Sequence, residues 1–476
     1  MVFSVFAAAD AAPDSDALVC DGARLTFAEL ARRVAARSEQ LNALGLLTSE
    51  ARPLALLVDH GLAMFECLYA LWAAGIPVLP IHPRLTGPER QLLLDASGAR
   101  AFLEPATLAP IAPAATWPRA LPAAEQRALV LVASSGSTGR PKLVELSRGA
   151  FAALVSADAA RVPPVPGDRA LLCLPLSHVG GLSLVLRALA AQRCLVVLRT
   201  SGPGLLGSIP ELTRALIDER ISLLSLVPPV LARLLRHEPA IAERAPLRAL
   251  LLGGQACSAE LYEEARARGV PLLTSYGLTE MCSQVTTQSF PPPRVTPLRQ
   301  GVVGVGFPLP GVEIRIVDGL IEVRGPTLFS GYVGQPSRLD AEGFFATGDR
   351  GEFDAELGLF VFGRASELII SGGENVDPTE VEHALLACGG LEAACVFAVP
   401  DPEFGERVAV AIEPTPATPL DDRALFAALD QRLASFKQPR SWCQFETLPR
   451  LASGKLDRSR IRREALQHLR PRRREP

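Results

Sequence analysis

Short apolar runs alternate with segments of helical periodicity over roughly the first 300 residues of the chain. The run at 54–58 is short and almost wholly apolar, which is typical of a buried strand. Apolar residues at 63–74 recur at helical spacing up to Gly75, and another apolar run follows at 77–80. This succession of strand, helix and strand predicts a parallel, doubly wound sheet. Further strands are predicted at 128–133, 169–174, 195–198, 223–227 and 250–252, and further helices at 151–160, 182–190, 210–220 and 229–236.

Local signals add to this pattern in the N-terminal third. Thr26 lies three residues before Glu29, the spacing of a capping box, so a helix is expected to begin here and to continue through Leu41. The segment 104–124 is rich in Ala and Pro and has no periodicity, which predicts a surface connection.

The hydrophobic pattern changes after about residue 302. The segments 312–317 and 319–325 alternate apolar and polar residues, as half-exposed antiparallel strands do. After Arg364 the pattern becomes mixed, with helices predicted at 378–387 and 421–433 and strands near 394–399 and 408–412. The predicted fold class is therefore α/β. A large N-terminal domain (1–364) of doubly wound sheets ends in a small β-rich unit, and a small α+β domain (365–476) follows.

The composition of the chain indicates how many domains it has and which kinds of partner it lacks. At 476 residues and 48% hydrophobic content, the chain is expected to form more than one domain. Its net charge of −3, with both signs interspersed, argues against nucleic acid or an anionic membrane as a partner. The nine cysteines are scattered without a CxxC pair, so they are expected to be buried apolar residues in a reducing compartment rather than zinc ligands. Neither a signal peptide nor an apolar run of about 20 residues is found, which predicts a soluble cytoplasmic protein. No pattern indicates an oligomeric state.

The loop after the predicted strand 128–133 concentrates groups suited to a polyphosphate. Its two glycines let backbone amides approach a ligand closely, and its hydroxyls and lysine offer donors to phosphate oxygens. Lys142 lies between Pro141 and Leu143, so the loop lacks the hydroxyl beside the lysine that a P-loop uses for magnesium. A Ser/Gly surface turn is the alternative. The candidate phosphate-binding residues are Ser134, Ser135, Gly136, Ser137, Thr138, Gly139 and Lys142.

Several short motifs follow this loop in a fixed order. They are Tyr276-Gly277-Leu278-Thr279-Glu280, Thr347-Gly348-Asp349, Gly363-Arg364, Ser371-Gly372-Gly373-Glu374-Asn375-Val376, Pro449-Arg450 and Gly454-Lys455-Leu456-Asp457-Arg458. In type and order they resemble the motifs of the adenylate-forming superfamily of acyl-CoA synthetases, peptide-synthetase adenylation domains and luciferases, over nearly the whole chain. The resemblance implies that ATP activates a carboxylic acid as an acyl-adenylate, that a thiol then displaces AMP, and that the small C-terminal domain is mobile.

The first motif has a physical interpretation that agrees with this resemblance. The ring of Tyr276 can lie against adenine while Gly277 permits a tight turn, although a core tyrosine at a strand end would look the same. Thr279 places a hydroxyl near phosphate, and Glu280 places a carboxylate where Mg²⁺ could bridge to ATP, the alternative being a surface glutamate. The resemblance implies that these residues bind the nucleotide and the metal.

Residues further along supply the remaining nucleotide contacts. Asp349 can accept hydrogen bonds from the two ribose hydroxyls, and the alternative is an aspartate that only stabilises a turn. Arg364 is expected to donate to ribose or phosphate. By the resemblance, Gly254 belongs to the nucleotide site and Gly253 to the acid pocket. Lys455 is the main candidate for chemistry, because the acid carboxylate and the α-phosphate are both anionic and need a bridging cation. A solvated surface lysine is the alternative.

The segment 174–187 is expected to line the acid pocket, because it resembles the corresponding segment of the o-succinylbenzoate-CoA ligases of menaquinone biosynthesis. His178 is expected to line the pocket and to join the catalytic group, unless it caps a helix. Arg187 can hold a second carboxylate, or it can be a snorkelling surface arginine. Two positions depart from the relatives. Ser177 replaces a common aromatic, and Ser366 stands at the hinge where many relatives have Asp or Lys.

Free coenzyme A is the expected thiol, because the chain ends soon after Lys455 without a carrier domain. The segment 372–375 resembles the surface that admits the pantetheine arm. ATP, Mg²⁺ and coenzyme A are thus the implied cofactor and co-substrates. The alternatives are a ligase for another aryl or acyl acid, such as benzoate, anthranilate or a fatty acid, and a non-catalytic nucleotide-binding protein.

Overall fold

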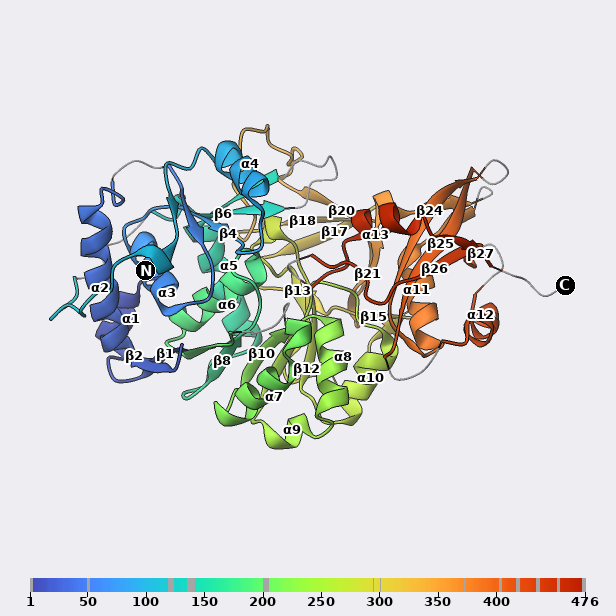
Figure 1. Cartoon of the computed structure of the whole chain (residues 1–476), viewed down its shortest axis with the longest axis horizontal. Coiled ribbons are helices and arrows are strands. Elements are labelled where there is room, and N and C mark those ends of the chain that lie inside the picture. Colours follow the sequence, from blue (N-terminus) through green and yellow to red (C-terminus); the bar gives the residue numbers. More distant parts are fainter. Residues whose placement is uncertain are drawn as a thin grey trace.

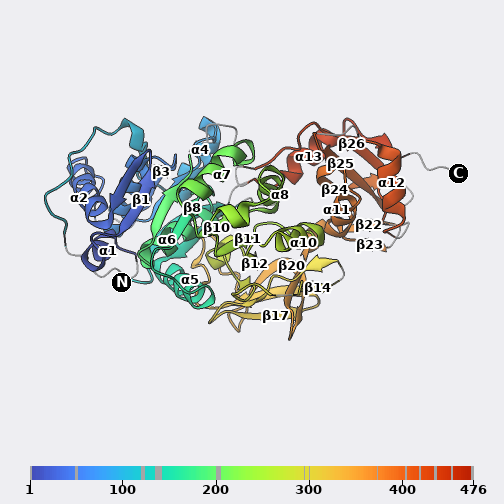
Figure 2. The ribbon, with the colours of Figure 1, turned by 90° about the horizontal axis from the view of Figure 1, so that it is seen from below.

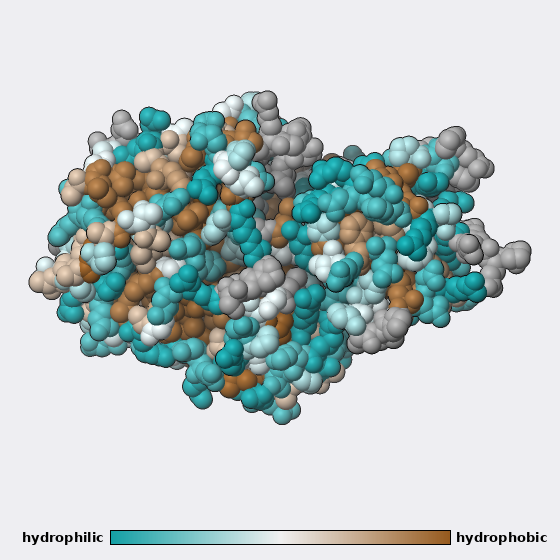
Figure 3. Space-filling view, in the orientation of Figure 1, coloured by the Kyte–Doolittle hydropathy of each residue, from teal (hydrophilic) through white to brown (hydrophobic). Residues whose placement is uncertain are grey.

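The computed structural model of the chain describes residues 3–48, 52–118, 124–134, 142–199, 205–293, 295–299, 301–371, 374–401, 405–416, 420–433, 437–451 and 454–472. The molecule is elongated, with the N-terminal part at one end and the C-terminal part at the other (Figure 1). On the face shown in Figure 3, apolar residues gather over the N-terminal part, on the left, and the C-terminal part is mostly hydrophilic.

The largest sheet has nine described strands and runs through the middle of the N-terminal part. Its six strands from β12 to β1 pair in parallel, and antiparallel strands flank them at both edges. From edge to edge they are β16 (Phe307–Pro308), β13 (Thr286–Thr287), β12 (Leu272–Tyr276), β11 (Ala249–Leu252), β10 (Leu223–Leu226), β8 (Arg169–Leu172), β9 (Cys194–Val197), β1 (Asp16–Cys20) and β2 (Ala23–Thr26).

A second sheet, of six described strands, combines four parallel strands with the antiparallel β7 and β19. In order they are β19 (Gly331–Tyr332), β7 (Lys142–Ser147), β6 (Ala128–Ser134), β4 (Val78–Ile81), β3 (Leu54–Leu57) and β5 (Phe102–Leu103). The helices of this part are α1 (Val5–Ala11), α2 (Phe27–Ala43), α3 (Leu62–Ala73), α4 (Gly87–Ser97), α5 (Arg148–Arg161), α6 (Val179–Ala190), α7 (Ile209–Asp218), α8 (Pro228–His237), α9 (Ile241–Arg244) and α10 (Ala259–Ala267), with the short turns η1 (Pro105–Thr107) and η2 (Leu205–Gly207).

Both faces of the nine-stranded sheet are covered, as a doubly wound sheet requires. Neighbouring strand residues point to opposite faces, so Leu171 packs in the core cluster under α7 and α8 while Leu172 packs in the cluster with α5 and α6. The prediction of parallel, doubly wound sheets is confirmed. Seen from below, α8 and α10 lie beside the C-terminal part (Figure 2).

Apart from β16 and β19, the chain after residue 297 forms smaller units. A two-stranded ribbon precedes a four-stranded antiparallel sheet, and the latter confirms the predicted β-rich unit. The ribbon is β14 (Leu298–Arg299) with β15 (Val302–Val303), and the sheet is β17 (Glu313–Val317), β18 (Leu320–Arg324), β20 (Phe345–Asp354) and β21 (Gly358–Arg364).

The C-terminal unit is a mixed α+β layer, as predicted. Two core clusters there draw their buried residues only from position 369 onward. The predicted boundary between residues 364 and 365 stays a prediction, which this separation of the cores supports. The elements are η4 (Ala365–Glu367), β22 (Ile369–Ser371), β23 (Glu374–Val376), α11 (Pro378–Ala387), β24 (Leu391–Asp401), β25 (Gly405–Pro414), α12 (Asp422–Asp430), β26 (Ser441–Gln444), α13 (Arg458–Ala465) and β27 (Arg470–Pro471).

Several local predictions are confirmed. The capping box of Thr26 and Glu29 is present at the start of α2, and eight of the nine cysteines are buried. The described part of the segment 104–124 lies mostly at the surface, as predicted, although Leu108 and Trp117 pack against the core and Trp117 donates a hydrogen bond to Asp10. No helix among the described residues is long and apolar enough to span a membrane.

Candidate active site

The described part of the predicted nucleotide site centres on Asp349, in the middle of β20. The pairing of β20 with β21 places Arg364 opposite Asp349. Arg364 Nε lies 2.8 Å from one carboxylate oxygen, and the Tyr276 hydroxyl donates to the other at 2.5 Å. Burial raises the pKa of Asp349, although Arg364, the Tyr276 hydroxyl and Lys455 act in the opposite direction. A carboxylate has about four acceptor positions, so ribose hydroxyls can still bind beside these two partners.

The turn after β12 requires glycine. A Cβ atom at Gly277 would lie 1.4 Å from the carbonyl oxygen of Ser283, so only glycine allows the chain to fold back here. This return places Thr279 and Glu280 in the short turn η3 (Thr279–Met281), directly after Tyr276. The predicted tight turn is confirmed.

Tyr332 connects the metal candidate Glu280 with Lys142. Its hydroxyl donates to Glu280 Oε1 at 2.7 Å, and Lys142 Nζ lies 5.5 Å from the centre of its ring. Tyr332 reaches this position because β19 pairs with β7, which begins at Lys142. Tyr332 was not predicted from the sequence, since β19 has only two residues and carries no motif.

The predicted phosphate loop joins the ends of β6 and β7. Ser134 ends β6 and pairs with Lys142, which begins β7, so the loop leaves a strand end as expected. The candidates Ser135, Gly136, Ser137, Thr138 and Gly139 lie outside the described residues.

Lys455 comes from the C-terminal unit and lies beside residues of the N-terminal part. A Cβ atom on Gly254 would lie 3.4 Å from Lys455 Cε, so the lysine passes directly over this glycine. Gly254 has φ +80° and Gly253 follows the end of β11, which places both glycines at the carboxyl end of the sheet. Lys455 retains solvent access, but the protein around it lowers its pKa by desolvation, Arg364 lowers it further, and Asp349 opposes both.

His178 is a half-buried, neutral histidine near the same lysine. It is the N-cap residue of α6, but its side chain makes no capping hydrogen bond, and Nε2 has no partner among the described residues. Burial lowers its pKa to about 4, with further contributions from Lys455 and His82. The imidazole is therefore uncharged at neutral pH and belongs to the surroundings of Lys455.

Arg187 is not a snorkelling surface residue. Its side chain is 11% exposed and lies 3.0 Å from Asp158 of α5, and it also donates to Gln284 at 3.2 Å and to Ser183 at 3.0 Å. The protein therefore already engages this guanidinium, and a second carboxylate would have to share it.

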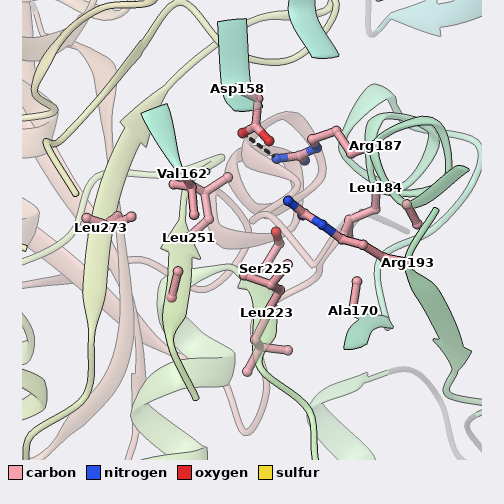
Figure 4. Close-up of a pocket in the computed structure, with 13 residues that line it drawn as sticks. Asp158, Val162, Ala170, Leu184, Arg187, Arg193, Leu223, Ser225, Leu251 and Leu273 are labelled. Atoms are coloured by element: carbon pink, nitrogen blue, oxygen red, sulfur yellow. Dashed lines mark hydrogen bonds and ion pairs between the residues drawn. The ribbon is translucent and has the colours of Figure 1, made fainter. Parts of the chain in front are cut away.

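A small cavity of about 50 Å³ lies beside this ion pair. Figure 4 shows the guanidinium of Arg193 pointing toward the space between Arg187 and Ser225. Arg193 is 8% exposed, and its Nε lies 3.7 Å from Asp168 without a hydrogen bond to a described residue. Arg193 was not predicted from the sequence. An arginine directly before the apolar strand β9 was the signal that could have identified it.

The site thus consists of two groups of residues. Tyr276, Asp349, Arg364, Gly254 and Lys455 form the first group, which we call the nucleotide side, and Glu280 with Tyr332 lies next to it. His178, Arg187, Asp158 and Arg193 form the second group, the acid side, along and beside α6. Among the described residues, no group of three or more His, Cys, Asp or Glu could hold a metal ion.

Known proteins match the chain over nearly its full length. A sequence profile described as AMP-binding enzyme matches residues 5–333, and one described as AMP-binding enzyme C-terminal domain matches 380–455. The chain is 31% identical to a 2-succinylbenzoate-CoA ligase of Bacillus pumilus, covering 94% of this chain and 95% of that protein. It is also 31% identical to a feruloyl-CoA synthase of an Amycolatopsis species, covering 95% and 96%. The solved o-succinylbenzoate CoA synthetase of Bacillus subtilis, in complex with its acyl-adenylate intermediate, matches with a TM-score of 0.85 at 27% identity, covering 97% of this chain and 98% of that one.

Proposed function

Because the chain belongs to the AMP-binding enzyme family, we propose that it is an ATP-dependent ligase that joins o-succinylbenzoate to coenzyme A. The reaction has two steps. A carboxylate oxygen of the acid attacks the α-phosphorus of ATP and pyrophosphate leaves, and the thiolate of coenzyme A then attacks the acyl carbon and AMP leaves. The first step is needed because an oxide is a poor leaving group, whereas AMP leaves readily.

The observation that carries this proposal is the position of Lys455 between the two sides of the site. Its ammonium interacts electrostatically with Asp349 on the nucleotide side and with His178 on the acid side. A cation at this point lies where an acid carboxylate would meet the α-phosphate, and it would stabilise the charge that develops on phosphorus. His178 is neutral there, so it adds no charge of its own to the approach of the acid.

The remaining nucleotide contacts follow from the residues around Asp349. Asp349 would accept hydrogen bonds from the ribose hydroxyls, with Arg364 holding the carboxylate in place. Glu280 would hold Mg²⁺, because this ion prefers oxygen ligands. The Tyr332 hydroxyl donates to one oxygen of the carboxylate and would hold it in place. When bound, the ion neutralises phosphate charge. The loop 134–142, with Lys142 at its end, would bind the phosphates of ATP.

The acid side supports a dicarboxylic acid. Arg187 lies nine residues along α6 from His178, about 13 Å of helix rise, and helical side chains lean back toward the N-terminus. The cavity beside Arg187 is lined by the guanidiniums of Arg187 and Arg193, which lie 3.0 Å from Asp158 and 3.7 Å from Asp168. Arg193 Nε makes no hydrogen bond to a described residue, so a second carboxylate of the substrate would supply the missing acceptor. A cytoplasmic enzyme of menaquinone biosynthesis follows as part of the same proposal.

Acid-dependent exchange of labelled pyrophosphate into ATP tests the proposal directly. The assay is run with o-succinylbenzoate, ferulate, benzoate and a medium-chain fatty acid, with the Lys455→Ala variant as the inactive control. We expect the highest kcat/KM with o-succinylbenzoate. Exchange with none of the acids would contradict the ligase proposal, and a clear preference for another acid would overturn the substrate while leaving the ligase class.

An aryl monocarboxylic acid such as ferulate is the second candidate. The feruloyl-CoA synthase is as similar to this chain as the 2-succinylbenzoate-CoA ligase is. The engagement of Arg187 by Asp158, Gln284 and Ser183 also favours it, because a guanidinium that is satisfied by protein has less to gain from a second carboxylate. The ferulate arm of the exchange assay separates the two candidates.

A further inference from the structure

Helix α8 of the N-terminal part faces the C-terminal unit along its length (Figure 2). At its start, a Cβ atom on Gly454 would lie 3.6 Å from the side chain of Val227, the N-cap residue of α8. Toward its end, Arg233 and Arg236 are three residues apart and therefore share a face. Its apolar residues, from Val230 to Leu235, pack into the core of the N-terminal part. The helix is thus fixed on one side and presents two cations on the other.

Glu392, in β24 of the C-terminal unit, accepts from both arginines. Arg233 Nε lies 2.8 Å from Oε1, and Arg236 donates to Oε2 at 2.7 Å and to Oε1 at 3.0 Å. The Glu392 side chain is only 2% exposed. Burial alone would raise its pKa, but the hydrogen bonds from Arg233 and Arg236 lower it below the ordinary value. An ionised carboxylate is therefore enclosed at the contact between the two parts of the molecule.

Glu413, in β25, extends this contact to the loop that carries Lys455. Its side chain is 3% exposed, and Arg233 Nη2 lies 3.7 Å away. Glu413 accepts from Arg450 at 3.2 Å, and Arg450 in turn donates to the carbonyl of Gly454 at 3.4 Å. The backbone of Arg450 also forms an antiparallel β-bridge with that of Leu456 at the base of the loop. A continuous series of contacts thus leads from α8 to the two neighbours of Lys455.

We infer that Glu392, held by Arg233 and Arg236, is a positioning residue that sets where Lys455 stands over Gly254 during adenylation. This inference rests on the proposed function, in which Lys455 bridges carboxylate and α-phosphate. Lys455 belongs to the C-terminal unit and its target to the N-terminal part, so the contact between the parts fixes its position. A displacement of about 1 Å costs on the order of 100-fold in rate when a reacting group must be aligned.

The first test replaces Glu392 by Gln, which keeps the shape of the side chain and removes its charge. We expect pyrophosphate exchange to fall by about 10- to 100-fold. KM for ATP should change by less than about twofold, because Glu392 lies outside the predicted nucleotide site. Thioester formation from presynthesised acyl-adenylate should also change by less than about twofold, because that step does not join carboxylate and phosphate. Equal loss in both half-reactions, or no loss of exchange in a folded variant, would overturn the inference.

A second pair of variants covers the case in which Glu392→Gln does not fold. Arg236 and Arg266 both have side chains that are 47% exposed and both pair with a glutamate, but the partner of Arg266 is Glu263, within α10. Arg236→Gln should lower exchange without affecting thioester formation, and Arg266→Gln should lower neither. Equal behaviour of the two variants would overturn the inference. Failure of the proposed function would be seen separately, as wild-type protein that shows no exchange with any acid.

Discussion

The nucleotide side and the acid side of the site differ in how their charged groups are held. Asp349 accepts from Tyr276 and Arg364 and still has acceptor capacity, and Lys455 over Gly254 retains access to solvent. Arg187, in contrast, is enclosed and bonded to three residues of the protein itself. The nucleotide side is therefore ready to bind its ligand, whereas on the acid side a ligand must compete with an internal ion pair.

This difference determines where substitutions should act. On the nucleotide side the removal of one group leaves its neighbours partly solvated, so the effect should fall on catalysis or on ATP binding. On the acid side the removal of one partner leaves a buried charge unpaired, which costs about 3–5 kcal/mol of stability when the pair is fully enclosed. Variants on that side need a matched partner variant before their kinetics can be interpreted.

The largest effect is expected for Lys455→Ala. Loss of a cation that stabilises the transition state should lower adenylation by about 10²–10³-fold or more. Thioester formation from presynthesised acyl-adenylate should be largely retained, because the lysine is needed only while carboxylate meets phosphate. Both half-reactions are measured separately, with Lys437→Ala in the same C-terminal unit as the control. Equal loss in both half-reactions would contradict the role assigned to Lys455.

Asp349→Ala should raise KM for ATP sharply without changing acid selectivity. Each charge-assisted hydrogen bond to a ribose hydroxyl contributes about 1.5–3 kcal/mol, which corresponds to roughly 10- to 150-fold in affinity. Asp354→Ala is the control, since Asp354 ends the same strand and pairs with Arg299 at the surface. Unchanged ATP affinity in a folded Asp349→Ala variant would show that the ribose is bound elsewhere.

Arg187 and Asp158 sharpen the comparison on the acid side, because only the Arg187 variant should raise KM for o-succinylbenzoate. Arg187→Leu should raise KM for o-succinylbenzoate by about 10- to 100-fold more than KM for benzoate. Asp158→Asn removes the competing carboxylate but keeps Arg187, so KM for o-succinylbenzoate should fall or stay constant. Steady-state kinetics with o-succinylbenzoate and with benzoate measures both KM values in each variant. If Arg187→Leu weakens both acids equally, Arg187 is a structural residue.

The same contrast explains what the sequence could predict. The nucleotide side is built from short motifs with their own glycines, such as the turn at Gly277, so residue type and order already indicated its parts. The acid side depends on packing between distant segments. Asp158 reaches Arg187 from another helix, and no local pattern indicates that contact. Arg193 enters the cavity from the residue before β9, and its place before an apolar strand was the only local signal for it.

Elements of the fold follow the same rule. Helix α11 has the bounds predicted from its apolar spacing, 378–387, because the face that it buries is continuous in sequence. Helix α4 was missed, since only Leu93 and Ser97 of its residues are buried and its apolar stripe is weak. Strand β1 was missed because it pairs in parallel with β9, which is distant in the chain. Strand β2 pairs with β1 in a local hairpin through Asp21-Gly22, a turn signal that could have identified both strands.

The smallest expected effect concerns pH and stability, where the two sides should respond with opposite signs. Burial lowers the folded-state pKa of His178 to about 4, below its ordinary value of 6.5. Between these values the unfolded chain binds a proton that the folded chain does not, so acidification destabilises the fold. Burial raises the folded-state pKa of Asp349 above 3.8. The folded chain then binds that proton first as the pH falls toward this value, and acidification stabilises the fold there.

His178→Asn should therefore reduce the loss of unfolding free energy between pH 7 and pH 5 by about 1–2 kcal/mol. His60, whose pKa is also lowered to about 4, remains in that variant, so part of the loss should persist. Asp349→Asn removes a group that favours the folded state on acidification. This variant should therefore lose at least as much unfolding free energy between pH 7 and pH 5 as the wild type does. Urea unfolding at several pH values measures all three proteins. Identical losses in the wild type and His178→Asn would mean that His178 titrates normally in the folded state, and the neutral imidazole beside Lys455 would then have no basis.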